Sequence, residues 1–293
     1  MTEPLVLTVD DVHKSCASLQ NFHAQFGKIF RQYENNPIDG SPAHNERENF
    51  PDKKLIIESQ NRGLYSIEFA ADHLLAMTKS IDTNIAFFTL ARGTLESAAL
   101  ALWFLDITVD DTVRCGRFLN SRYEELKAKD KFLDASGGAA EPDKINTLFT
   151  RAVALGYQEN TNAAGDRVGI GHPATGNGNL YFPKITNLIG TTLNQKDTYS
   201  ILSGVAHGFV WATSVMGFET IEIKVDETTT IKVFSKEITP KTIFYAFLKV
   251  FPAFARSTFA LWELYGWDKE ELKALYEKTF DELLINDAQK FWR

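Results

Sequence analysis

The chain has 293 residues, of which 44% are hydrophobic and 12% aromatic, and its formal net charge is −7. This hydrophobic content suffices for a sizeable core and excludes a globally disordered chain. The acidic balance disfavours broad, sequence-independent binding to nucleic acid. Cys16 and Cys115 are too few for a disulfide scaffold or a zinc cluster, so we expect two small buried hydrophobic residues. The first residues lack a basic region followed by an apolar one, which predicts a cytoplasmic protein.

Helical periodicity dominates the first part of the chain. Apolar residues recur every three or four positions between Asp10 and Tyr33, as is typical of an amphipathic helix. A break containing proline and glycine follows, and a polar loop is expected to extend to about Pro51. A second helix is predicted over roughly residues 53–80.

The most apolar helix is predicted from Phe87 to Leu105, yet it contains Arg92 and Glu96. These two residues are four positions apart, so their side chains lie on one face. A buried charge is costly unless it is paired, and we therefore expect partners from neighbouring helices to meet this pair. The two charges also argue that the segment is a core helix and does not span a membrane.

The next helix is predicted from Thr108 to about Lys131, with Arg114, Arg117 and Ser121 on one side. Short loops between consecutive helices favour antiparallel neighbours, so this side is expected to face the central helix.

A short helix over about residues 141–155 leads to a glycine-rich loop at 163–183. No Gly-Lys-Ser/Thr sequence ends this loop and no strand is predicted before it, which disfavours a nucleotide P-loop. Two interpretations stay open for the loop: a mobile surface segment, or a lid over a site. Another short helix is predicted over about residues 184–193.

The second informative helix is predicted from Asp197 to about Gly217. Tyr199, Ser203 and His207 follow one another at intervals of four and are expected to share one face. Alternating apolar and polar residues then predict a β-hairpin near 220–234, and two helices are predicted within 240–292.

Together these elements predict a mainly α fold: an antiparallel helical bundle with one small β-hairpin near 220–234. We expect a single domain over residues 1–293, with a core bundle at about 53–218. The predicted site is a central polar pocket. Its candidate catalytic residues are His207, Arg92 and Glu96, and its candidate ligand-binding residues are Arg114, Arg117, Tyr199 and Ser203.

These residue types suit acid–base chemistry on an anionic ligand. Histidine changes charge near neutral pH, and arginine can hold a phosphate or carboxylate through two hydrogen bonds. Glu96 could orient Arg92 or His207, or act as a base if burial raised its pKa. The alternative is a polar network that only fixes the register of the helices.

Metal chemistry and a serine nucleophile have less support. The sequence lacks the paired Glu-x-x-His motifs of di-iron sites and the His-Glu-x-x-His motif of zinc sites, so no metal and no cofactor are expected. Ser203 and His207 could pair as nucleophile and base, but no Gly-x-Ser-x-Gly motif supports this arrangement.

The residues also carry a family resemblance. Arg92 and Glu96 in an apolar helix, Arg117 near a tyrosine, and the sequence YSILSGVAHG at 199–208 resemble a group of bacterial helical proteins of the HEPN-like superfamily. The resemblance covers about residues 82–211. It implies a helical bundle, often dimeric, and in active members metal-independent RNA cleavage by an arginine and a histidine of one helix.

This chain departs from that pattern, because Ser200, Ile201 and Leu202 stand where active members carry the arginine. Cleavage would then require Arg92 or Arg114 to supply the cation from another helix. Three functions stay open. The protein could bind a small anionic ligand or a nucleotide, with or without weak ribonuclease activity, as a monomer or a homodimer. It could be a non-catalytic regulatory or interaction protein. It could also be a small-molecule enzyme whose glycine-rich lid closes over the pocket.

Overall fold

Helices form most of the computed structural model, which describes residues 7–137, 142–174, 180–216, 220–224, 229–234 and 239–284. This confirms the mainly α fold class. The single-domain boundaries stay a prediction.

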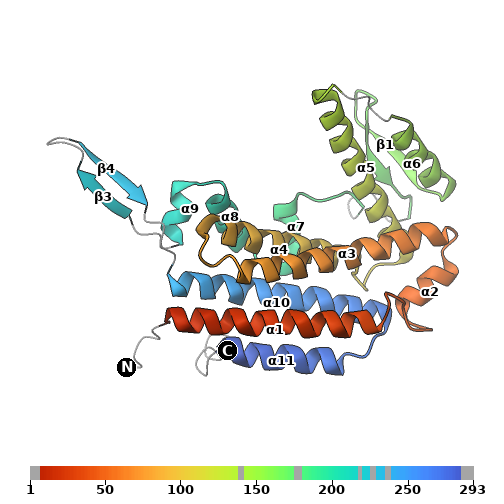
Figure 1. The fold of residues 1–293 in the computed structure, drawn as a ribbon. Coiled ribbons are helices and arrows are strands. Elements are labelled where there is room, and N and C mark those ends of the chain that lie inside the picture. The colour runs from red at the N-terminus through yellow and green to blue at the C-terminus, as the bar shows by residue number, and fades with distance from the viewer. Residues whose placement is uncertain are drawn as a thin grey trace.

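Two packed layers of long helices make up the body of the molecule (Figure 1). One layer holds α1, α10 and α11, and α3 and α4 pack over it. The bounds of these helices are α1 Val9–Gln32, α3 Lys53–Thr78, α4 Asn84–Phe104, α10 Pro240–Tyr265 and α11 Glu270–Leu284. Aromatic rings fill the interior of the first layer, where Phe22 of α1 meets Phe251 of α10 edge to face at 4.9 Å and Tyr276 of α11 at 4.8 Å.

Side chains with a local role begin several of these helices. Thr8 accepts a hydrogen bond from the backbone N–H of Asp11, whose carboxylate accepts one from Thr8 N–H, so a capping box starts α1. Asp52 and Asp110 cap α3 and α5 through the N–H groups three positions later. Such caps are local, which explains why the predicted helix positions agree closely with the structure.

The ends of the molecule carry smaller elements (Figure 1). At one end, α5 rises from the body and packs against α6 and a two-stranded sheet. Helices α8 and α9 lie toward the other end, where a second hairpin projects from the body. The bounds are α2 Pro42–Asn49, α5 Asp111–Ala135, α6 Pro142–Ala154, β1 Gln158–Thr161, β2 Arg167–Gly171, α7 Ile185–Leu193, α8 Lys196–Ala206, α9 Val210–Val215, β3 Thr220–Lys224 and β4 Thr230–Phe234. The antiparallel pair β3–β4 confirms the predicted hairpin.

The expectation of an irregular loop with no preceding strand is wrong for part of the glycine-rich segment. Strands β1 and β2 form an antiparallel hairpin, and Asn162 shapes the turn by accepting hydrogen bonds from the N–H groups of Ala164 and Asp166. Asn120 of α5 holds β2 in place through two hydrogen bonds of 2.9 Å to the backbone of Ile170. Residues 175–179 of the segment lie outside the described residues.

The predicted helix over 197–217 is interrupted, and its last residue lies outside the described part of the chain. Helix α8 ends where Gly208 adopts a left-handed conformation with φ of 71°. The N–H of Phe209 bonds to the carbonyl of Gly204 at 2.8 Å, and the N–H of Gly208 bonds to that of Val205 at 2.9 Å. This is a Schellman cap, which glycine favours because it has no Cβ.

One described helix segment, Ile85–Phe104 of α4, is long and apolar enough to cross a membrane by length and composition alone. In the fold this segment packs between α3, α8 and α10. Burial against these helices accounts for its apolar composition, as expected for a core helix.

Candidate functional site

Four of the predicted site residues meet where α8 packs against α4. Glu96 Oε1 accepts a hydrogen bond of 2.8 Å from Arg92 Nε and one of 2.7 Å from the hydroxyl of Tyr199. Arg92 Nη1 lies 3.2 Å from Nε2 of His207, and its guanidinium group stands 5.5 Å from the centre of the Tyr199 ring. We call these four residues the Arg92 cluster.

The Schellman cap positions the histidine of this cluster. His207 is the C-cap residue of α8, and its own N–H bonds to the carbonyl of Ser203 at 3.0 Å. The chain turns away at Gly208, so the imidazole is exposed at the end of the helix yet reaches Arg92. Ser203 itself is half-buried, and within the described residues no hydrogen bond joins its hydroxyl to the cluster.

The contact between Arg92 and His207 joins two groups with different hydrogen-bonding roles. A guanidinium group can only donate hydrogen bonds, so a hydrogen bond between the two uses Nε2 of His207 as the acceptor. The cluster thus places a permanent cation beside an imidazole.

Partial exposure moderates the electrostatics of the cluster. The side chains of Arg92 and Glu96 are 25% and 29% exposed. The sequence suggested a deeply buried pair, but this pair is only partly buried. Partial burial opposes the charge on Arg92, but the hydrogen bond and the negative charge of Glu96 outweigh it and raise the pKa of Arg92. Burial and the hydrogen bond to Glu96 raise the pKa of Tyr199 to about 12, so this hydroxyl keeps its proton and donates a hydrogen bond to Glu96.

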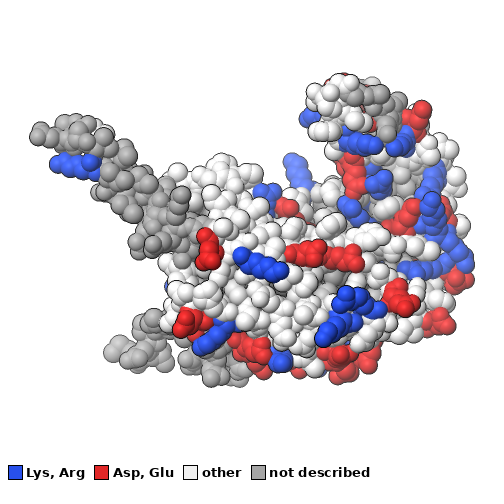
Figure 2. All heavy atoms as spheres, in the orientation of Figure 1, with Lys and Arg blue, Asp and Glu red and all other residues white. Residues whose placement is uncertain are grey.

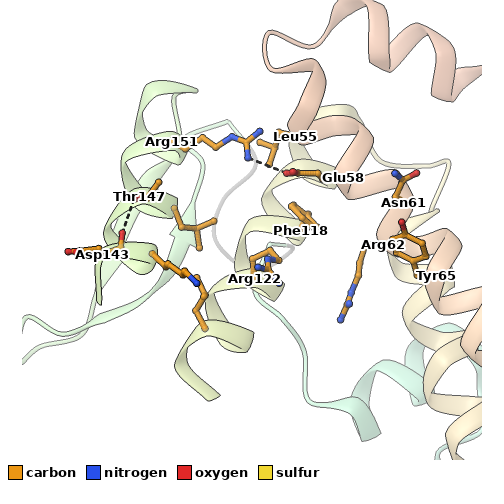
Figure 3. Close-up of a pocket in the computed structure, with 13 residues that line it drawn as sticks. Leu55, Glu58, Asn61, Arg62, Tyr65, Phe118, Arg122, Asp143, Thr147 and Arg151 are labelled. Atoms are coloured by element: carbon orange, nitrogen blue, oxygen red, sulfur yellow. Dashed lines mark hydrogen bonds and ion pairs between the residues drawn. The ribbon is translucent and has the colours of Figure 1, made fainter. Parts of the chain in front are cut away.

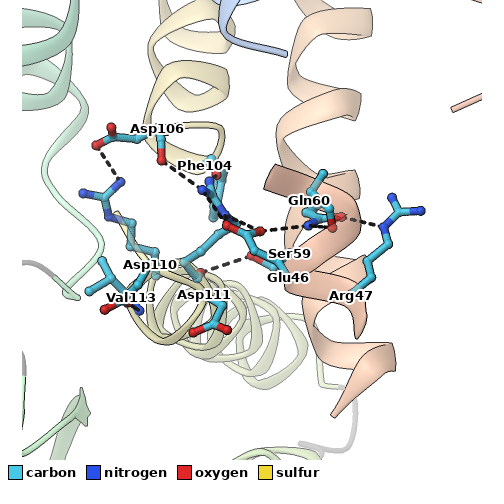
Figure 4. Close-up of polar contacts among 12 residues, drawn as sticks. Glu46, Arg47, Ser59, Gln60, Phe104, Asp106, Asp110, Asp111 and Val113 are labelled. Carbon is cyan, nitrogen blue, oxygen red and sulfur yellow. Dashed lines mark hydrogen bonds and ion pairs between the residues drawn. The ribbon is translucent and has the colours of Figure 1, made fainter. Parts of the chain in front are cut away.

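The expectation that Arg114 and Arg117 face Arg92 is wrong. Both arginines donate to carbonyls at the C-terminal end of α4, about 18 Å along the helix from Arg92 at 1.5 Å per residue. Figure 4 shows this helix end, with Phe104 and Asp106 near Glu46. Arg117 Nη1 donates to the carbonyl of Trp103 at 2.5 Å and lies 3.4 Å from Asp106 Oδ2.

Arg114 is completely buried at this helix end. It donates to the carbonyls of Phe104 and Asp106 and forms an ion pair of 3.0 Å with Glu46 of α2. Both arginines thus satisfy carbonyls that a helix terminus leaves unpaired and place positive charge at its negative end. Their position follows from the packing of α5, which contacts α3 more extensively than α4.

Sequence reasoning missed Glu46, because residues up to about Pro51 were expected to form a polar loop. In the structure they include α2, which Ser41 caps and Pro42 begins. Serine followed by proline at the first helical position is a helix-start signal that could have revealed this element. Glu46 also accepts a hydrogen bond of 2.8 Å from Gln60, so α2, α3 and α5 share this carboxylate.

The other site predictions concern metals and the lid. Within the described residues, no group of three or more His, Cys, Asp or Glu side chains could hold a metal ion. Strand β2 of the glycine-rich segment packs on α5 and β1 packs on α6, at the opposite end of the molecule from α8 (Figure 1). The hairpin β1–β2 is therefore not a lid over the Arg92 cluster.

Cys16 and Cys115 lie in the buried environment that the sequence predicted. Both are free thiols, and burial raises the pKa of each, that of Cys16 to about 11.

Comparison with known proteins identifies no relative of this chain. No family model, no curated protein and no solved structure matches it.

Proposed function

We propose that the Arg92 cluster binds a small phosphate-bearing ligand, such as a nucleotide or a short single-stranded RNA, and cleaves RNA weakly without a metal ion. The observation that supports this proposal is the 3.2 Å contact between Arg92 Nη1 and His207 Nε2. It puts a phosphate-binding group and an imidazole at one exposed place, although they come from different helices.

In the proposed reaction, Arg92 binds the phosphate and His207 acts on the nucleophile. A phosphate oxygen replaces Nε2 of His207 as the acceptor at Arg92, and the freed imidazole nitrogen takes the proton of the neighbouring ribose hydroxyl. The ribose oxygen then attacks phosphorus, the bond to the next nucleotide breaks, and water protonates the leaving oxygen. Glu96 and Tyr199 act as positioning residues that hold the guanidinium group.

Charge limits the class of ligand. Glu96 already balances much of the charge of Arg92, so binding should be modest. On the face drawn in Figure 2, acidic and basic side chains are interspersed over the helical body. A long polyanion would meet alternating charges there, which favours a small ligand or a short strand.

A second candidate function follows from the bridging position of Glu96. One carboxylate oxygen accepts hydrogen bonds from α4 and from α8, so the network could serve only to fix the register of these helices. A regulatory or interaction protein would need no more than that.

The test compares RNA cleavage and thermal stability in wild type, His207→Ala and Arg92→Lys, with His13→Ala as the control at an exposed histidine of α1. We expect chelator-resistant cleavage of short single-stranded RNA, reduced by about 100-fold or more in His207→Ala and unchanged in the control. Nucleotides should raise the melting temperature of wild type and do so less for Arg92→Lys, which loses the planar guanidinium fork. Binding without cleavage would reduce the site to a binding site. If neither binding nor cleavage is detected, the proposal is refuted and the register function is favoured.

A further inference from the structure

A cleft of about 610 Å³ lies between α3, α5 and α6 (Figure 3). Its volume is within the usual range for small-molecule sites. Leu55 of α3 and Phe118 and Leu126 of α5 line this cleft, and all three side chains are largely buried. Tyr65 of α3 adds a half-exposed aromatic ring to the same cleft. These side chains offer an apolar surface on which a flat molecule could lie.

Two cations of this cleft share one carboxylate. Arg62 of α3 and Arg122 of α5 line the cleft, and both pair with Glu125. Arg62 Nη2 lies 2.5 Å from Glu125 Oε1, while Arg122 Nη1 contacts the other carboxylate oxygen. One negative charge cannot balance two positive charges, so this part of the cleft has a local excess of positive charge.

Arg62 also has an unused hydrogen-bond donor. Its Nε atom is buried and has no hydrogen-bond partner within the described residues. A buried polar atom without a partner is costly, and a guanidinium group donates best to an anionic oxygen. The pairing with Glu125 holds the guanidinium group of Arg62 in place, and the side chain is 32% exposed, so a small shift of this side chain would present the unused donor to such an oxygen.

The opposite part of the cleft pairs two cations with two carboxylates, because Lys54 Nζ lies 3.9 Å from Glu58 Oε1 in addition to the contacts of Arg151. Arg151 of α6 forms two hydrogen bonds, of 2.7 and 2.9 Å, with the carboxylate of Asp52 and one of 3.2 Å with Glu58. This network joins α6 to α3 and fixes the walls of the cleft. The excess positive charge is therefore located at Arg62 and Arg122.

We propose that this cleft binds a small amphipathic organic anion. Its flat apolar body lies against Phe118 and Leu126, and its single acidic group lies between Arg62 and Arg122. The site is separate from the Arg92 cluster. The ring of His73 packs on Gly93, next to Arg92, and Arg62 lies roughly 16 Å away from His73 along α3.

Binding of the aromatic sulfonate dye ANS tests this proposal, since the dye fluoresces in apolar sites and carries one anionic group. We expect saturable binding to one site. The double variant Arg62→Met with Arg122→Met should weaken it by about tenfold or more, and Arg256→Met, at an exposed arginine of α10, should not. Uncharged phenylnaphthylamine, which lacks the sulfonate, should bind wild type about tenfold less tightly than ANS.

Thr147→Trp provides a second variant that leaves the arginines intact. Thr147 lines the cleft from α6 and is exposed, so an indole there should obstruct the cleft without disturbing the core. We expect this variant to reduce dye binding as strongly as the double variant, with unchanged helical circular dichroism. Dye binding that is unchanged in both variants would place the dye elsewhere on the protein and overturn the proposal. His207→Ala should leave dye binding unchanged. The proposal for this cleft can therefore fail or succeed independently of the proposal for the Arg92 cluster.

Discussion

Replacing Arg114 by methionine should destabilise the protein much more than replacing Arg92. The side chain of Arg114 is 0% exposed and that of its partner Glu46 is 13% exposed. The substitution leaves this carboxylate without its cation and leaves the carbonyls of Phe104 and Asp106 without their donor. Breaking a buried pair from one side costs about 3–5 kcal/mol, which corresponds to a fall in melting temperature on the order of 10 °C.

Arg92→Met should cost only about 1–2 kcal/mol. Its side chain is 25% exposed, water reaches Glu96, and Tyr199 continues to donate to that carboxylate. The sequence suggested Arg92 as a buried charge at the centre of the fold, whereas in the structure Arg114 is the more deeply buried of the two arginines.

The free energies of unfolding can be measured by urea titration followed by circular dichroism, with Arg256→Met as the control at an exposed arginine. Adding Glu46→Gln to Arg114→Met removes the unpaired charge and should recover part of the loss, about 1–3 kcal/mol. A cost below about 1 kcal/mol for Arg114→Met, or a larger cost for Arg92→Met, would refute the reasoning.

Three further predictions concern pH and close packing. Hydrogen bonds from Arg151 hold the pKa of Asp52 below its usual value of 3.8. The contribution of Asp52 to stability is therefore present above pH 3.8 and is lost as the pH falls through the lower pKa of the folded state. Asp52→Asn should reduce this loss of stability at acid pH, as measured by urea titration. The pKa of Tyr199 rises from 10.0 to about 12, so stability should fall between these pH values, and Tyr199→Phe should reduce that fall. Gly204→Ala should cost about 1–3 kcal/mol in a melting experiment, because its Cβ would lie 2.5 Å from that of Ala212, whereas Gly190→Ala, with no atom nearer than 3.5 Å, should cost little.

Much of the helical fold could be predicted because the determining signals are local. Apolar periodicity and capping residues located α1, α3, α4, α10 and α11, and alternation located β3–β4. The hairpin β1–β2 could not be recognised in this way. Strand β1 reads Gln-Glu-Asn-Thr and is almost entirely exposed, so it has no apolar alternation, and its position depends on contacts such as those of Asn120 with Ile170.

The sequence by itself determined which residues recur at intervals of four, which paired Arg92 with Glu96 on one helix and Tyr199 with His207 on another. The spacing of four residues along a helix is a local property of the backbone. Only the tertiary structure decided which helix each face meets. Because α5 packs chiefly on α3, Arg114 pairs with Glu46, and the excess positive charge of Arg62 and Arg122 arises between helices, at a place that no local pattern encodes.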